Sequence, residues 1–353
     1  MRRLLRRRTV HATTALAVTL ASLAVAELVS VDSAAPASDR PPHHLTRGFR
    51  NVDRQYSYSL VRRIVHVLRR VPEEARGRPL EVVAADLATL RAAATTAVTW
   101  VGHSTFLVQV GGLNVLTDPN WNERTSPVPF AGPRRLVPPG VRFEDLPRIH
   151  AVIISHDHYD HLDRATVRRL ARDHRPTFFV PLGLKAWFVG DGIANVVELD
   201  WWESRAFGPL TLTCTPAQHS SGRSLALSDQ NLRLWSSWVV AGPDKRFFFG
   251  GDTGYYPGLG EIGRRLGPFD VAALPIGGYS DYHGGHPNHL SPEEALQAFE
   301  DLGARLMVPM HWGTFSLNRE PFAEPPRRLL AEALRRGDEE RVALLSPGQT
   351  IRW

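Results

Sequence analysis

The sequence of 353 residues has a single cysteine, Cys214, and only two lysines among its 42 basic residues. One cysteine excludes an internal disulfide and a cysteine-rich zinc finger. No cysteine stands directly after the apolar run near the N-terminus, and this absence excludes a lipoprotein anchor. Hydrophobic residues make up 43% and charged residues 22%. This balance excludes global disorder, a collagen and a coiled coil, and it allows a sizeable core.

Positive charge is concentrated near the N-terminus. Residues 1–35 carry +3 and residues 36–78 carry +6, so residues 79–353 carry −3 of the total of +6. A basic arm on a mildly acidic body argues against nucleic-acid binding by the main domain. It indicates instead that the arm meets an anionic surface.

Residues 1–35 have the layout of a secretory signal peptide. Five arginines precede an apolar run, and small residues follow it. The run is almost long enough to span a bilayer, so an uncleaved anchor stays open. We therefore expect an exported or membrane-anchored protein at the extracytoplasmic face. A cytoplasmic, membrane-associated protein is the alternative.

Residues 36–95 are expected to form a basic N-terminal extension with helices. Residues 36–55 are rich in Pro, His and Arg, which is typical of a linker. Apolar side chains at helical spacing, interleaved with five basic residues, predict a helix over Tyr56–Val71. This helix would either pack on the main domain or lie in a membrane interface. A short helix is expected near Val82–Ala94.

From residue 96 onward, short β-rich runs alternate with helical patterns. Gly111 and Gly112 predict a hairpin turn between two strands. The alternation predicts an α/β sandwich of sheets covered by helices over residues 96–353.

The run Ser155–Asp163 places three imidazoles and three carboxylates between a buried strand and a helix. Imidazole and carboxylate are the normal ligands of zinc and related divalent metals. A polar loop in which Asp163 caps the helix is the alternative. Single His or Asp residues end three later strands. The candidate metal ligands are His156, His158, Asp160, His161, His219, Asp252 and His311.

The motifs WVGHSTFLV, LTDPNW, ISHDHYDHLD, PAQHSSGR, FFGGDTGYY, HLSPEEA and MHWGTF resemble those of the metallo-β-lactamase-fold hydrolases. More narrowly, they resemble the N-acyl-phosphatidylethanolamine-hydrolysing phospholipase D branch, and some are similar to the ascorbate-phosphate lactonases. The resemblance covers residues 98–318 and implies an αββα sandwich of two β-sheets flanked by helices.

The resemblance also implies a site for two divalent metal ions, zinc being the default. His156, His158 and His219 would hold one metal, and Asp160, His161 and His311 the other, with Asp252 as the bridge. His289, at the mouth of the site, would help to protonate the leaving group or bind phosphate, and it joins Asp252 as a catalytic candidate. Residues beside the ligands are expected to be His103, Asp118 and Asp157. An apolar wall for the substrate is expected from Trp121, Phe130, Trp201 and Trp202.

We therefore expect a metal-dependent phosphodiester hydrolase of phospholipase D type. It would cleave N-acyl-phosphatidylethanolamine or a similar phospholipid by a metal-bound hydroxide. A lactonase of the same fold acting on a phosphorylated lactone and a non-catalytic metal-binding scaffold are the alternatives. The expected partners are the phospholipid and a membrane surface, contacted through the basic arm. No nucleic acid is expected, and a homodimer is left open.

Overall fold

The computed structural model describes residues 40–55, 77–92, 95–279, 286–317 and 319–353. The signal-like segment 1–35 and the predicted helix Tyr56–Val71 lie outside the described residues. Contacts divide the chain into a unit of residues 1–42 and 57–70 and a unit of residues 43–56 and 71–353. Both β-sheets and the flanking helices belong to the second unit. No helix in the described ranges combines the length and the apolar content needed to cross a membrane.

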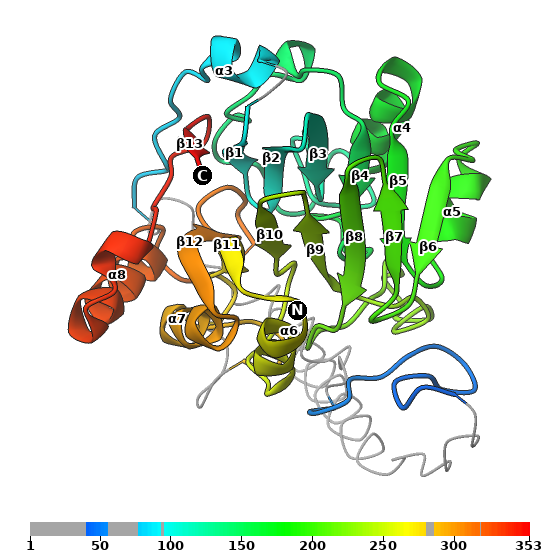
Figure 1. Ribbon diagram of the computed structural model, residues 1–353. Helices are drawn as coiled ribbons and strands as arrows, with labels where there is room; N and C mark the ends of the chain where they lie inside the picture. The colour runs from blue at the N-terminus through cyan, green and yellow to red at the C-terminus, as the bar shows by residue number, and fades with distance from the viewer. Residues whose placement is uncertain (1–39, 56–76, 93–94, 280–285, 318) are drawn as a thin grey trace, which may run out of the picture. The chain divides into compact units, whose positions relative to one another are not determined.

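Two mixed β-sheets form the centre of this unit (Figure 1). The seven-stranded sheet has the order β13-β1-β2-β3-β4-β5-β6, and the six-stranded sheet has the order β12-β11-β10-β9-β8-β7. The strands of the first sheet are β1 (Ala97–Gly102), β2 (Thr105–Val110), β3 (Leu113–Thr117), β4 (Ala151–Ile153), β5 (Thr177–Pro181), β6 (Val196–Leu199) and β13 (Thr350–Arg352). Those of the second are β7 (Ser204–Phe207), β8 (Leu210–Thr215), β9 (Ser237–Ala241), β10 (Arg246–Phe249), β11 (Phe269–Pro275) and β12 (Ala304–Met310).

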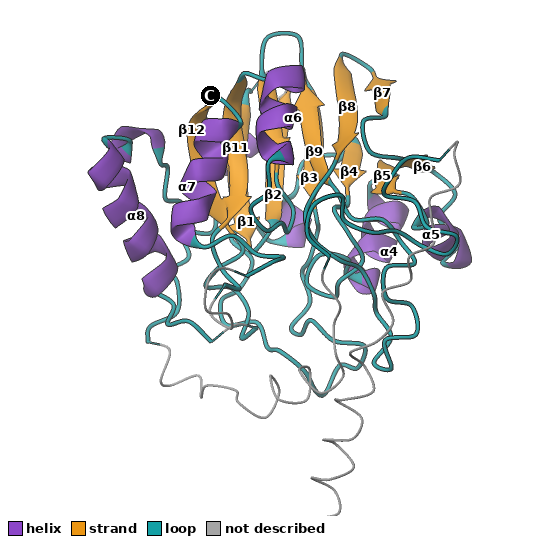
Figure 2. Ribbon diagram, turned by 90° about the horizontal axis from the view of Figure 1, so that it is seen from below, coloured by secondary structure: helices purple, strands orange, loops and turns teal. Residues whose placement is uncertain are grey.

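Helices flank both sheets (Figure 2). The first sheet is covered by α4 (Arg164–Asp173) and α5 (Lys185–Gly190), whose apolar side chains share a cluster with it. The second is covered by α6 (Gly258–Leu266), α7 (Pro292–Asp301) and α8 (Glu324–Arg336). The short elements are α3 (Leu87–Arg91), η2 (Phe143–Asp145) and η3 (Glu339–Arg341). These layers confirm the αββα sandwich expected from the sequence.

The alternation of side chains along β2 shows how the layers are held together. Phe106 and Val108 point into the cluster that also contains Trp238 and Phe247 of the second sheet, whereas Leu107 joins the cluster beneath α4. Successive residues of a strand face opposite sides of a sheet, so one strand contributes to both layers of the core. The Trp238 indole also donates a hydrogen bond to the Ile154 carbonyl across the sandwich, at 2.9 Å.

Other local predictions have mixed outcomes. The hairpin is confirmed: β2 and β3 pair antiparallel, and Gly111 and Gly112 both adopt positive φ. The helix expected near Val82–Ala94 shrinks to α3, because the described residues before the Asp86 cap have no helical hydrogen bonds. Residues 43–55 do not behave as a linker, since they are hydrogen-bonded to the domain at several points.

Candidate metal centre

Four strands deliver the candidate ligands to one edge of the sandwich. The loop after β4 carries His156, His158, Asp160 and His161, while His219, Asp252 and His311 follow β8, β10 and β12. The first four residues therefore come from the seven-stranded sheet and the other three from the six-stranded sheet. Where the sheets meet, the structure brings all seven side chains together in two overlapping groups.

The first group consists of His156, His158 and His219. The Nδ1 atom of His158 lies 2.8 Å from Nε2 of His156 and 3.2 Å from Nε2 of His219. Ligand atoms on one tetrahedral zinc, with bonds of about 2.0–2.1 Å, are separated by about 3.3 Å. The three nitrogens thus point at a common position at spacings close to those of a shared metal.

The second group consists of Asp160, His161 and His311, together with His103. Both His161 Nε2 and His311 Nε2 lie 3.3 Å from Asp160 Oδ2. His103 donates from Nε2 to the same oxygen at 2.9 Å, which holds the carboxylate in place.

Asp252 lies between the two groups. Its Oδ2 atom is 3.1 Å from both His161 Nε2 and His311 Nε2, and 3.8 Å from His219 Nε2. Its Oδ1 atom is buried and has no hydrogen-bond partner among the described residues. This carboxylate is therefore the one placed to contact metals in both groups.

Hydrogen bonds behind the imidazoles select their tautomers. Asp118 accepts from Nδ1 of His161 at 2.7 Å and from the Ser155 hydroxyl at 2.5 Å. The same hydroxyl lies 2.9 Å from Nδ1 of His156, and the Asn288 carbonyl lies 3.0 Å from Nδ1 of His219. With a proton on each Nδ1, the lone pair on each Nε2 faces the centre. Such outer hydrogen bonds are a regular feature of metal-binding histidines.

The donor set therefore fits two divalent cations. Five imidazole nitrogens and two carboxylates converge, three of the imidazoles are held in the metal-binding tautomer, and one buried carboxylate oxygen lacks a protein partner. Nitrogen and oxygen ligands of this kind suit zinc, and they also suit iron and manganese.

The electrostatics of the site agree with this assignment. Burial lowers the pKa of His219 to about 3, so the imidazole is neutral. Burial also lowers the pKa of His161 and His311, but Asp252 and Asp160 outweigh it. They raise the pKa of His311 to about 9 and that of His161 well above its ordinary value. The two carboxylates thus attract positive charge to the place where a cation would supply it.

Backbone strain accompanies the site. His103, Asp118 and His311 all have positive φ, which side-chain-bearing residues rarely adopt. Gly251, just before Asp252, also has positive φ, and a Cβ there would lie 2.6 Å from Ser155 Cβ. The β10 end can approach the β4 loop this closely only because residue 251 is glycine.

His289 lies at the rim of the site, with its side chain 14% exposed. Its Nδ1 atom is 3.9 Å from Asp252 Oδ2, and its ring contacts those of His219 and His311. Burial lowers the pKa of His289 well below its ordinary value, so the ring is neutral. It could serve as a ligand by distance alone, since it forms a group with His219 and Asp252.

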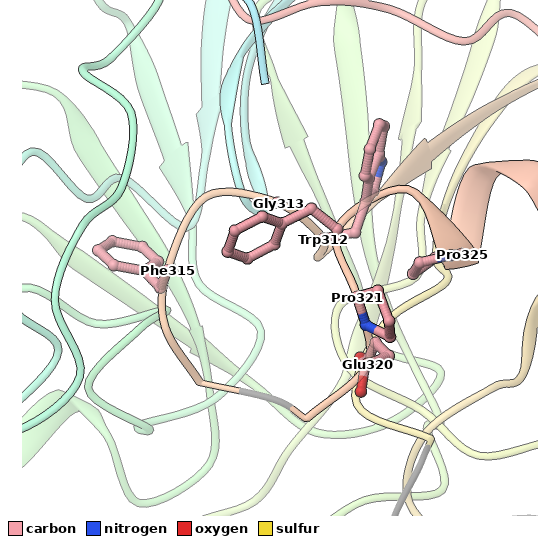
Figure 3. Close-up of a pocket in the computed structure, with 7 residues that line it drawn as sticks. Trp312, Gly313, Phe315, Glu320, Pro321 and Pro325 are labelled. Carbon is pink, nitrogen blue, oxygen red and sulfur yellow. The ribbon is translucent and has the colours of Figure 1, made fainter. Parts of the chain in front are cut away.

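Gly278 and Glu320 determine how closely the backbone approaches the His289 ring. A Cβ on Gly278 would lie 2.9 Å from Nδ1 of His289, and the Gly278 N–H donates to Glu320 Oε1 at 2.6 Å. Glu320 belongs to the chain segment that follows His311. This segment also forms a small pocket lined by Trp312, Gly313, Phe315, Glu320, Pro321, Phe322 and Pro325 (Figure 3).

Asp157 does not face solvent. Its side chain is fully buried and accepts from the Gly222 N–H and from Arg233 Nη1, both at 2.7 Å. Arg223 reaches the same loop and donates to the carbonyls of Asp157 and Leu162 at 2.6 and 2.9 Å. These contacts hold the two ends of the ligand-bearing loop. Arg223 ends the PAQHSSGR motif, but its contacts with this loop were not predicted, and none of the motifs given above includes Arg233.

The four aromatic residues expected to line the substrate differ in their surroundings. Trp201 is a core residue, 6% exposed, that stacks on His43. Trp202 lies beneath the Arg265 guanidinium, and Trp121 packs edge-on against Phe143. Phe130 is 80% exposed. Of the four, Phe130 is thus the most open to an incoming ligand.

The chain is similar to several known proteins. Residues 113–312 match the β-lactamase superfamily domain family. An uncharacterized protein of Mycobacterium tuberculosis is 41% identical over 324 residues, covering 89% of this chain and 85% of that protein. The N-acyl-phosphatidylethanolamine-hydrolyzing phospholipase D 1 of Caenorhabditis elegans is 43% identical over 247 residues, covering 67% of this chain and 69% of that protein. A metallo hydrolase from the archaeon Ignicoccus hospitalis shares the fold, with a TM-score of 0.56 at 24% identity over 74% of this chain and 99% of that one.

Proposed function

Because the chain belongs to the metallo-β-lactamase superfamily and is a metal-dependent hydrolase, we propose that it hydrolyses a phosphodiester lipid with a two-metal centre. The substrate class is that of a phospholipase D acting on N-acyl-phosphatidylethanolamine or a similar phospholipid. One observation carries this choice: the chain is 43% identical to a phospholipase D of that specificity over two thirds of its length.

In this proposal, His156, His158 and His219 would hold one metal, Asp160, His161 and His311 would hold the other, and Asp252 would serve both. When bound, the cations supply the positive charge that lowers the pKa of water and stabilises charge on a phosphoryl oxygen.

The chain's own groups orient the substrate and move its protons. His289 is neutral and partly exposed at the rim, so it can donate a hydrogen bond to a phosphoryl oxygen or to the leaving oxygen. Gly278 leaves room for the His289 ring, and the hydrogen bond to Glu320 keeps the Gly278 backbone in place. Asp118 and Ser155 keep protons on the outer nitrogens of the ligand histidines.

The test compares metal-loaded protein on N-acyl-phosphatidylethanolamine, bis(p-nitrophenyl) phosphate and a phosphorylated lactone. Phospholipase D chemistry releases N-acylethanolamine and phosphatidic acid. When the reaction is run in ¹⁸O-labelled water, attack at phosphorus places one label in the phosphatidic acid. Hydrolysis of the lactone without hydrolysis of either phosphodiester would contradict the proposal. Label in the alcohol product would contradict attack at phosphorus.

We also propose that the protein works at an anionic membrane outside the cytoplasm. Residues 36–78 carry +6, and each basic residue near such a surface contributes about 1 kcal/mol. Replacing Arg62, Arg63, Arg69 and Arg70 by Gln should weaken binding to phosphatidylglycerol vesicles at low salt and leave hydrolysis of a soluble phosphodiester intact. Equal vesicle binding by the variant and the unaltered chain would contradict this role of the arm.

A further inference from the structure

The peptide groups of His219 have no sheet partner. His219 follows β8 in a stretch without regular secondary structure, and it is almost fully buried. Buried backbone N–H and C=O groups nearly always find hydrogen-bond partners, so a residue from elsewhere must satisfy them. In β-strands a neighbouring strand does this, whereas here a single side chain does.

That side chain is Asn51, which is 3% exposed. Its Oδ1 atom accepts from the His219 N–H at 3.1 Å, and its Nδ2 atom donates to the His219 carbonyl at 2.8 Å. One amide therefore pairs with both peptide groups of the same residue, as the backbone of an adjacent strand would. The two residues are 168 positions apart in the sequence.

The Asn51 amide is itself held in one orientation. The Trp235 indole donates to Asn51 Oδ1 at 2.9 Å and also to the Ala217 carbonyl at 2.9 Å. Because an indole N–H can only donate, it fixes which end of the amide is the oxygen. The Ala217 carbonyl, two residues before His219, and the Asn51 amide are thereby tied to the same indole.

The segment that carries Asn51 is anchored at both ends. His43 and His44 each bond one oxygen of the Asp200 carboxylate at 2.7 Å. Toward the other end, Gln218 donates to the Arg54 carbonyl at 2.6 Å. We refer to residues 43–55 as the strap. Its anchors restrain the Asn51 backbone, so the amide meets His219 in a set position.

We propose that Asn51 is a positioning residue for the metal centre, and that the strap is part of the active site rather than a linker to it. Asn51 fixes the His219 backbone, and the Asn288 carbonyl fixes the outer nitrogen of the His219 ring at 3.0 Å. Together they aim His219 Nε2 at the position it shares with His156 and His158. Loss of the Asn51 side chain removes both hydrogen bonds to the His219 backbone, so the position of the His219 imidazole becomes less well defined.

The effect is specific to one metal. Asn51 contacts His219, whereas the group of Asp160, His161 and His311 is held by other residues, including His103 and Asp118. Removal of an outer hydrogen-bond partner lowers metal affinity by about 10–100-fold. We therefore expect Asn51→Ala to weaken one of the two metals by that factor and to leave the affinity of the other within about threefold.

The experiment titrates the metal-loaded full chain with a chromophoric chelator, and it follows the absorption spectrum of the cobalt(II)-substituted protein. Asn114→Ala is the matched control, because Asn114 also donates to a main-chain carbonyl, that of Arg148 at 2.9 Å, but lies in β3. The control should lower the unfolding temperature without changing either metal affinity. Trp235→Phe, which removes the donor to Asn51, should weaken the same metal to a smaller degree.

Unchanged affinities and an unchanged cobalt spectrum in Asn51→Ala would overturn the proposal, as would an equal loss of both metals. If Asn51→Ala fails to fold, Trp235→Phe decides: wild-type affinities in that variant would refute the role. The inference rests on the two-metal centre but not on the substrate. Selective weakening of one metal would therefore support it even if no phospholipid is hydrolysed.

Discussion

Replacing Asp118 by Asn tests whether the hydrogen bonds behind the ligands matter for metal binding. The Asp118 carboxylate is fully buried and accepts three hydrogen bonds, from His161 Nδ1, the Ser155 hydroxyl and the Ser155 N–H. Burial raises the pKa of this carboxyl, and the bonds from His161 and Ser155 oppose that rise. An amide has the same shape but only one oxygen, so it cannot accept at both ends.

Either orientation of the new amide is costly. If its oxygen faces His161, its NH₂ group meets the Ser155 N–H, and a buried donor loses its partner at a cost of about 1–3 kcal/mol. If its NH₂ group faces His161, the ring must take the tautomer with a proton on Nε2, the atom 3.1 Å from Asp252. That nitrogen can then no longer bind a cation. Metal binding therefore requires the orientation that leaves the Ser155 N–H unpaired, and we expect metal affinity to fall by about 10–100-fold, or about 1.4–2.8 kcal/mol.

The assay is chelator competition on metal-loaded Asp118→Asn, with Asp163→Asn as the matched control. Asp163 belongs to the same loop, but it caps α4 by accepting from the Ala165 and Thr166 N–H groups. Asn is as good a helix cap as Asp, and Asp163 makes no hydrogen bond to a candidate ligand, so the control removes the same charge without changing the tautomer of a ligand histidine. The reasoning would be refuted if Asp118→Asn kept wild-type affinity, or if Asp163→Asn lost as much.

Three further predictions concern single side chains. Asp252→Asn keeps the shape of the residue but removes the negative charge that lies between the two groups of candidate ligands. Metal analysis should therefore show the loss of one or both ions, and hydrolysis should stop. His289→Ala should lower turnover by about 10²–10⁴ with unchanged metal content, and a loss of metal would instead make His289 a ligand. Burial raises the pKa of Asp200, but His43 and His44 outweigh it and hold that pKa below its ordinary value. The stability contributed by Asp200 is thus present above about pH 4 and is lost as the pH falls further. Asp200→Asn lacks this pH-dependent contribution. Its unfolding temperature should therefore differ less between pH 7 and pH 3 than that of the unaltered chain.

Local patterns predicted the features that depend on neighbours in the sequence. Four candidate ligands fall within six residues, between a buried strand and a helix whose cap, Asp163, can also be read from the sequence. The hairpin at Gly111 and Gly112 is equally local. In such cases the spacing of residues along the chain already determines which groups can meet.

Features that depend on distant contacts were missed or misread. Nothing near Asn51 signals that its amide pairs with a residue 168 positions away. The composition of residues 36–55 predicted a linker, whereas residues 43–55 are held by hydrogen bonds to distant residues such as Asp200 and His219. Trp201 was expected at the substrate; it is 6% exposed and belongs to the main core cluster, and its contact with a substrate stays a prediction.

The origin of the ligands in two different sheets has a consequence for how the protein acquires its metal. Neither sheet alone carries a complete ligand set, so a high-affinity site can form only after the two sheets have packed. We therefore expect the protein to bind its metal after the two sheets have packed. For a given set of nitrogen and oxygen ligands, affinities for divalent ions follow a general order, and selectivity depends also on geometry and on which metals are available. The ions available in the compartment where folding finishes therefore help to decide which metal the protein carries.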